Sequence, residues 1–309
     1  MQYSFGKEKM APLKAIMVLI IIADHLALFF GVEWLRLFIE LGAPVVSVFF
    51  FISGYGLHVS YVKRGEEYLA SFFRLRFWKV LAPWLLATVL YAIFLWRPQD
   101  GLVDTLKAFV TKGEVILPFS WFAVEILVFY VCFYLVYKYL PQKWRLVVLW
   151  FVTIILMICA ITAGYDRCWW VSTLAFPTGL SFAMAEKSLY ASFKNRPARY
   201  WLLLLSLIVF FGMAYFPRQP YLWTLCYVCI PMIVALIVSV LPLQKLSLGL
   251  VIFLAMISYE IYLCQGIAMN LLRTYFNVNN NAVFVVLVYV LTIALAWLLH
   301  FLSGLITRR

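Results

Sequence analysis

The sequence predicts an all-α, polytopic integral membrane protein with about ten transmembrane helices, and three observations support this fold class. Hydrophobic residues make up 66% of the 309 residues and charged residues only 12%, a composition far from that of soluble domains. Apolar windows of about 20 residues, long enough to cross a bilayer as a helix, recur along the whole chain. Lys and Arg residues gather in alternate connections, which is the pattern that sets membrane topology.

The basic residues also give the direction of the predicted spans. With the N-terminus placed in the cytoplasm, eighteen of the 25 Lys and Arg residues fall on the cytoplasmic side. We therefore expect both termini in the cytoplasm and one transmembrane domain over residues 1–309, with no loop long enough for a soluble domain. The ten expected spans cover residues 13–31, 43–62, 78–96, 118–138, 146–164, 168–186, 200–216, 221–241, 248–271 and 282–304.

The charge and the cysteines exclude two other classes of function. The net charge of +12 comes from basic residues scattered between apolar segments, which indicates contact with membrane lipids rather than with nucleic acid. The six cysteines lie almost entirely in apolar stretches, where cysteine acts as a small hydrophobic residue. Cys226 and Cys229 form a C-x-x-C pair without a second pair or a nearby histidine, so we assign no metal.

The first span carries a histidine inside its apolar run. A helix turns about 100° and rises about 1.5 Å per residue, so the eleven steps from Lys14 to His25 return to nearly the same face about 16 Å further on. One face would then carry a cation at the membrane surface and an imidazole within the hydrocarbon. Ionisable groups at that depth usually serve function. The alternative is a histidine that only hydrogen-bonds a neighbouring helix.

Two glutamates are expected at a similar depth. Glu125 lies in the fourth span and Glu260 in the ninth, and the rise per residue places both near the layer of His25. A carboxylate bonded to one imidazole nitrogen makes the other a better general base. Asp24 is a weaker partner because adjacent helical side chains point about 100° apart. A purely structural polar network has the same pattern in the sequence.

The second span contains a patch of small residues at Ser53, Gly54 and Gly56. Such a patch allows either a close approach of two helices or a close approach of backbone to a ligand, and we count Ser53 among the candidate donor-binding residues. His58 lies nearer the cytoplasmic end, where a snorkelling or packing role is expected rather than catalysis.

A basic segment with Arg74 and Arg76 precedes the third span, on the same side of the membrane as Lys14. Its cations suit either lipid headgroups or the phosphates of an anionic cytosolic ligand.

The motifs together resemble the membrane-bound acyltransferase family 3, which includes polysaccharide O-acetyltransferases. The resemblance spans most of the chain, and two positions depart from the usual family pattern. Lys14 stands where arginine is usual, and Gln265 stands where a histidine often follows the SYxxYL block, so a catalytic role of that position is in doubt. The matching pieces are Lys14 with His25, FFFISGYG at 49–56, the basic segment through Pro83, WFAVEILVFY at 121–130 and ISYEIYL at 257–263.

The resemblance implies transfer of an acyl group, usually acetyl, from cytosolic acyl-CoA to a hydroxyl of a cell-surface or lipid-linked saccharide. A multi-pass protein of the cell (inner or plasma) membrane is the matching location. His25 is then the candidate general base, with Glu125 or Glu260 orienting it. Lys14, Arg74 and Arg76 are candidates for binding the phosphates of acetyl-CoA.

Two other functions stay open. Ionisable residues within the membrane and small-residue patches also occur in transporters and flippases for glycolipids or small solutes. A non-catalytic scaffold of the same fold is favoured by the departures at Lys14 and Gln265. The sequence leaves open the acceptor sugar, the acyl chain, the oligomeric state, and whether transfer is direct or passes through an acyl-histidine.

Overall fold

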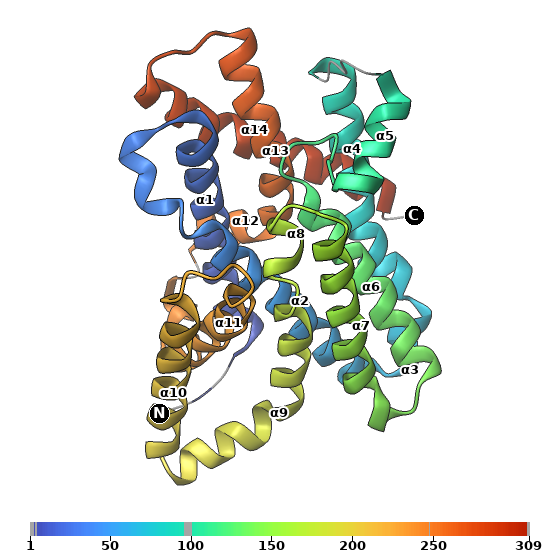
Figure 1. Cartoon of the computed structure of the whole chain (residues 1–309), viewed down its shortest axis with the longest axis vertical. Helices are drawn as coiled ribbons and strands as arrows, with labels where there is room; N and C mark the ends of the chain where they lie inside the picture. Colours follow the sequence, from blue (N-terminus) through green and yellow to red (C-terminus); the bar gives the residue numbers. More distant parts are fainter. Residues whose placement is uncertain (1–2, 4, 96–100, 247, 308–309) are drawn as a thin grey trace. The chain divides into compact units, whose positions relative to one another are not determined.

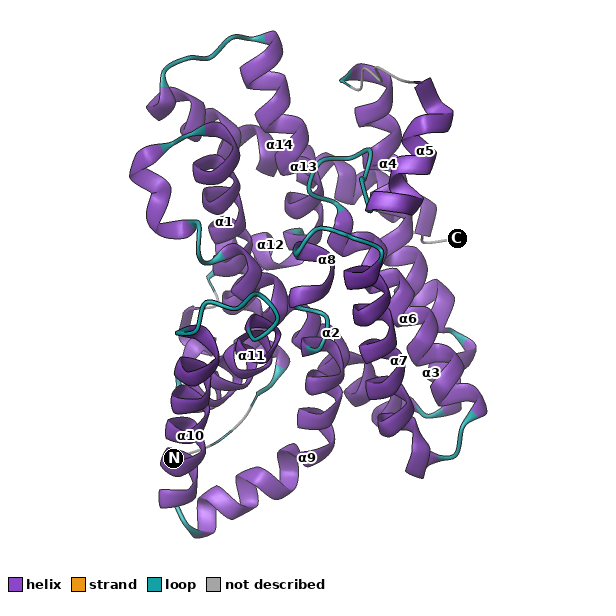
Figure 2. Cartoon of the chain, viewed as in Figure 1, coloured by secondary structure: helices purple, strands orange, loops and turns teal. Residues whose placement is uncertain are grey.

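The computed structural model describes residues 3, 5–95, 101–246 and 248–307, and these ranges contain helices and no strand (Figures 1 and 2). The expected all-α polytopic fold is confirmed. The chain divides into two compact units that alternate along the sequence. Unit 1 comprises Met1–Pro12, Ala43–Ser71 and Val128–Ser247, and unit 2 comprises Leu13–Gly42, Phe72–Leu127 and Leu248–Arg309.

Two helices are divided between the units, and a third contributes only its first residue, Gly42, to unit 2. Helix α1 spans Lys7–Phe30 and helix α6 spans Trp121–Tyr139. The other helices of unit 1 are α2 (Gly42–Arg64), α3 (Glu66–Ala70), α7 (Gln142–Thr162), α8 (Cys168–Val171), α9 (Ala175–Asn195), α10 (Ala198–Tyr215), α11 (Trp223–Val240) and the 3-10 helix η3 (Leu243–Leu246). Unit 2 adds the 3-10 helix η1 (Glu33–Phe38), the π-helices η2 (Phe73–Phe77) and η4 (Leu271–Tyr275), and helices α4 (Trp78–Phe94), α5 (Gly101–Lys112), α12 (Gly249–Met256), α13 (Ser258–Asn270) and α14 (Asn281–Thr307).

Eight helical segments of the described chain are long and apolar enough to cross a membrane, or nine if α12 and α13 form one span bent by 73°. The segment expected at 168–186 differs from the prediction, because it consists of the short helix α8 and the longer helix α9. Between them Ser172 donates to the Ala43 carbonyl and Thr173 to the Trp169 carbonyl, and such bonds compete with a regular helix. The first turns of α9 are buried in protein, so this helix does not need an apolar surface throughout.

Within unit 1, helix α9 contacts α7, α10 and α11. It also crosses α2 at two glycines. A Cβ on Gly54 would overlap the Phe176 carbonyl, and a Cβ on Gly179 would overlap the Phe51 carbonyl. The small-residue patch of the second span therefore serves close helix packing at Gly54. Gly56, by contrast, faces open space.

In unit 2, α13 packs along α14, and both contact α4 (Figure 1). The hydroxyl of Tyr289 on α14 donates to the Leu19 carbonyl on α1 at 2.9 Å. At the end of α1, the Arg273 guanidinium donates to the Phe30 and Val278 carbonyls and to Asn281. These bonds fix the segment of α1 that carries His25 against the last helices of the chain.

We predict that Gly54→Ala and Gly179→Ala each destabilise the protein by about 1–3 kcal/mol, because the added methyl group collides with rigid backbone. The midpoint of thermal unfolding in detergent measures the effect. Gly56→Ala is the matched control on the same helix, and it should be neutral or stabilising by up to about 1 kcal/mol. Equal midpoints for all three variants would show that α2 and α9 do not touch at these glycines.

Candidate functional site

Helix α1 places Lys14 and His25 as the sequence predicts. The helix is continuous from Lys7 to Phe30, so the two residues lie on nearly the same face, about 16 Å apart along the axis. Lys14 is half-buried, and the His25 side chain is 13% exposed. His25 is thus mostly enclosed by protein but keeps an accessible edge.

The aromatic ring of Phe119 stacks on the His25 imidazole, with centroids 4.1 Å apart and an interplanar angle of 24°. Phe119 belongs to the connection before α6 and has a left-handed backbone, with φ of 66°. A bulky residue pays about 1–3 kcal/mol for this conformation, and such strain is concentrated at functional sites. The hydroxyl of Tyr262 donates to the Phe119 carbonyl, which holds the strained residue in place.

One face of α13 supports both Phe119 and His25. Tyr262, Gln265 and Gly266 are three and four residues apart, so they lie side by side on the helix surface. Gly266 leaves room for the Phe119 connection, because a Cβ there would lie 3.0 Å from Cβ of Pro118. Gln265 is fully buried, donates through Nε2 to the Tyr262 carbonyl at 3.1 Å, and lies beside His25.

Asp24 does not form a hydrogen bond with His25, although the two residues are adjacent in the sequence. Its Oδ2 lies 3.9 Å from Nε2 of His25, which is too long for a hydrogen bond. The carboxylate instead accepts the backbone N–H of Gly42, the first residue of α2. A Cβ on Gly42 would overlap this carboxylate, so the contact needs glycine. A carboxylate at a helix N-terminus is favourable because the helix dipole is positive there.

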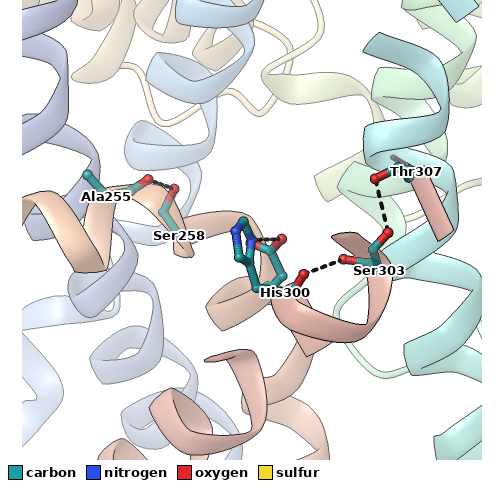
Figure 3. Close-up of polar contacts among 6 residues, drawn as sticks. Ala255, Ser258, His300, Ser303 and Thr307 are labelled. Atoms are coloured by element: carbon teal, nitrogen blue, oxygen red, sulfur yellow. Dashed lines mark hydrogen bonds and ion pairs between the residues drawn. The ribbon is translucent and has the colours of Figure 1, made fainter. Parts of the chain in front are cut away.

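Glu260 is hydrogen-bonded to a histidine that the sequence analysis did not select. Its Oε1 lies 2.8 Å from Nδ1 of His300 on α14 (Figure 3). The Glu260 side chain is 8% exposed and that of His300 is 40% exposed. Ser303 donates to the His300 carbonyl and Thr307 to that of Ser303, as Figure 3 also shows. The available signal was a third histidine within an apolar span, at 282–304.

Glu260 occupies the first turn of α13, immediately after the 73° bend that separates α12 from α13. The bend leaves backbone groups without their helical partners, and the Ser258 hydroxyl donates to one of them, the Ala255 carbonyl (Figure 3). The N-terminal end of α13 also stabilises the negative charge of Glu260.

The other predicted site residues are distributed over both units. Glu125 is buried on α6 and belongs to unit 2, as does η2 with the exposed Arg74 and the half-buried Arg76. Ser53 is half-buried on α2 in unit 1. Their roles in binding or catalysis stay predictions. His58, also in unit 1, has Nδ1 2.7 Å from the Tyr137 hydroxyl, as expected of a packing residue.

The sequence analysis missed the contribution of Phe119 and Tyr262, and of Gln265 as a neighbour of His25. Tyr262 and Gln265 were visible as a pair three residues apart in the ISYEIYLCQG stretch, on one helix face. No comparable signal marks Phe119, whose role depends on a left-handed backbone and on contacts distant in the sequence.

The arrangement suits proton transfer at His25. The imidazole is held between a stacked aromatic ring and a buried amide, and part of its ring is accessible. A neutral imidazole in such a place can take a proton from a hydroxyl that reaches its free nitrogen.

Comparison with known families agrees with this chemistry. A family model described as an acyltransferase domain, that of acyltransferase family 3, matches residues 13–301 and so includes Lys14, His25 and the whole of α13. Comparisons with curated proteins and with solved structures gave no significant match. Because the family model covers nearly the whole sequence, this multi-pass membrane protein belongs to acyltransferase family 3.

Proposed function

We propose that the protein transfers an acetyl group from cytosolic acetyl-CoA to a hydroxyl of a cell-surface or lipid-linked saccharide, with His25 as the general base. The cell membrane is the proposed location. The observation that carries the proposal is the His25 imidazole itself, which lies in a membrane span of a family of acyltransferases, is stacked on Phe119 and keeps an accessible edge. An alcohol is a poor nucleophile until its proton is removed, and an imidazole at the transfer point removes it.

The proposed reaction balances without a metal or a redox cofactor. The saccharide oxygen attacks the thioester carbonyl carbon while its proton passes to His25. The new C–O bond forms and the C–S bond breaks, so that the electron pair leaves with the CoA sulfur. His25 then returns the proton to that sulfur, which regenerates the neutral imidazole for the next turnover.

The donor end of the site is proposed around Lys14, Arg74 and Arg76, and all three belong to the unit that contains His25. Their cationic groups suit the phosphates of CoA. The distance of about 16 Å along α1 between Lys14 and His25 then leaves room for the pantetheine arm to extend toward the base. Ser53 belongs to the other unit and stays a candidate donor-binding residue on the ground of the sequence alone.

Two carboxylates remain proposed contributors to the chemistry. Glu125 is buried on α6 in the same unit as His25. Glu260 is hydrogen-bonded to His300, so its influence on the reaction would include that second imidazole. A buried carboxylate of this kind can hold an imidazolium in place and stabilise positive charge during proton transfer.

A transporter of a glycolipid or small solute is the second candidate, and the bend between α12 and α13 favours it. Transporters often place ionisable groups at interrupted helices, as Glu260 and His300 are placed here. Acetyl-CoA-dependent labelling of glycan separates the two candidates, since a transporter needs no acyl donor.

We predict that His25→Ala lowers acetylation of cell-surface glycan by about 10²–10⁴-fold, the contribution of a positioned general base. The O-acetyl content of glycan is measured in cells that hold equal amounts of wild-type and variant protein in their membranes. His58→Ala is the matched control, because it removes a histidine that packs against Tyr137, and it should keep acetylation. Full acetylation by His25→Ala would exclude His25 as the base.

We predict that Lys14→Ala raises the KM for acetyl-CoA by about 10- to 100-fold, the equivalent of one lost hydrogen bond to a charged group. Initial rates of label transfer from radiolabelled acetyl-CoA in inverted membrane vesicles provide the measurement. Lys14→Arg retains the positive charge and should have a KM close to that of the wild type. The phosphate-binding role is wrong if Lys14→Ala has the same KM as the wild type.

A further inference from the structure

Two buried polar atoms at the site have complementary hydrogen-bonding properties. Nδ1 of His25 and Oε1 of Gln265 are both buried without a hydrogen-bond partner among the described residues, although the two side chains are neighbours. A ring nitrogen can carry a proton and donate it, whereas an amide oxygen only accepts. Leaving either atom unpaired in the interior costs about 1–3 kcal/mol, and one hydrogen bond between the two side chains would satisfy both atoms.

The orientation of the Gln265 amide follows from its second contact. Only the amide nitrogen can donate to the Tyr262 carbonyl, and Nε2 lies 3.1 Å from that oxygen. This bond commits the NH₂ group, and Oε1 is left for His25. Because Gln265 is fully buried, water cannot satisfy the amide in another orientation.

We propose that Gln265 is a positioning residue for His25. Its side-chain oxygen accepts a hydrogen bond from the protonated Nδ1 of His25, and the lone pair of the imidazole is therefore on Nε2. This inference rests on the proposed function, in which His25 is the general base. Nδ1 is buried although the His25 side chain is 13% exposed, so the accessible edge of the ring lies away from Nδ1. The tautomer selected by Gln265 therefore carries its basic nitrogen on the side that a substrate can reach.

Phe119 and Asp24 support the same assignment. Stacking on Phe119 fixes the plane of the imidazole, so that Gln265 has only to fix the position of the ring within that plane. The Asp24 carboxylate lies 3.9 Å from Nε2 and accepts the Gly42 N–H, and it makes no hydrogen bond that would hold the basic nitrogen. Nε2 thus stays available for the acceptor hydroxyl.

The test compares Gln265→Leu, which removes the acceptor oxygen, with Gln265→Glu, which keeps an acceptor oxygen in either protonation state. Both are assayed as full-length protein in inverted membrane vesicles, with radiolabelled acetyl-CoA and the acceptor of those membranes. We expect Gln265→Leu to lower kcat by about 10- to 100-fold, part of the contribution of a general base, with an unchanged KM for acetyl-CoA. Gln265→Glu should retain a higher kcat than Gln265→Leu, because it keeps an acceptor oxygen beside His25.

Asn270→Leu is the matched control on α13. The Asn270 amide also donates to a carbonyl of its own helix, that of Gly266 at 2.9 Å, but has no role at His25. Its removal should leave kcat unchanged, which separates loss of positioning from loss of a helix-stabilising bond.

Wild-type kcat in Gln265→Leu, or equal losses in Gln265→Leu and Gln265→Glu, would overturn the positioning role. If Gln265→Leu does not accumulate in the membrane, Gln265→Asn replaces it, because the amide that is one methylene shorter does not reach His25. Gln265→Asn should then show the loss in kcat, and wild-type kcat would overturn the inference. His25→Ala distinguishes the two proposals. Full activity of His25→Ala would show that His25 is not the base. An inactive His25→Ala together with fully active Gln265 variants would exclude only the positioning role of Gln265.

Discussion

The candidate site depends on the packing of one face of α13 against the connection that carries Phe119. Tyr262 holds the Phe119 carbonyl, Gly266 leaves space for the connection, and Gln265 contacts His25. A bulky residue with φ of 66° persists only where its surroundings determine its conformation, and here α13 supplies them. Without that face of α13, nothing would hold the Phe119 ring against the imidazole. His25 would then be an isolated polar group in an apolar helix.

The same helix separates two histidines. Glu260 and Gln265 are five residues apart, so their side chains point about 140° apart around α13 and differ by about 7.5 Å along it. One contacts His300 on α14 and the other contacts His25 on α1. Both histidines belong to unit 2, so this unit holds a more enclosed imidazole with an amide partner and a more exposed one with a carboxylate partner.

Apolar length and charge asymmetry were sufficient to predict the fold class, because a bilayer forces backbone groups to be satisfied within each helix. They were less informative at 168–186, where the first turns of α9 are buried in protein and its later part carries Glu186 and Lys187. The patch at Gly54 was compatible with either helix packing or a ligand, and the structure shows close helix packing there, since the neighbouring backbone leaves no room for a side chain. Periodicity likewise gave the relation of Lys14 to His25, which depends on a single continuous helix.

The partners of His25 were harder to predict, because the rise per residue gives depth but not direction. Glu260 was expected in the layer of His25, yet its hydrogen bond goes to His300, which lies 40 residues away in the sequence. The contact between Phe119 and His25 joins two segments that are distant in the sequence. It depends on the left-handed backbone of Phe119, which the residue type does not predict.

The Gln265 position looked like a departure that weakened the site, whereas the structure gives it a contact with His25. An amide in that place has a physical advantage within a membrane. A carboxylate beside His25 would stabilise the imidazolium and would carry its own desolvation cost, while an amide fixes the ring without adding a buried charge. A base that starts each turnover neutral is the form able to accept a proton from an alcohol. The proposed tautomer of His25 can therefore be maintained by neutral groups alone, while the Glu260–His300 pair lies on the other side of α13.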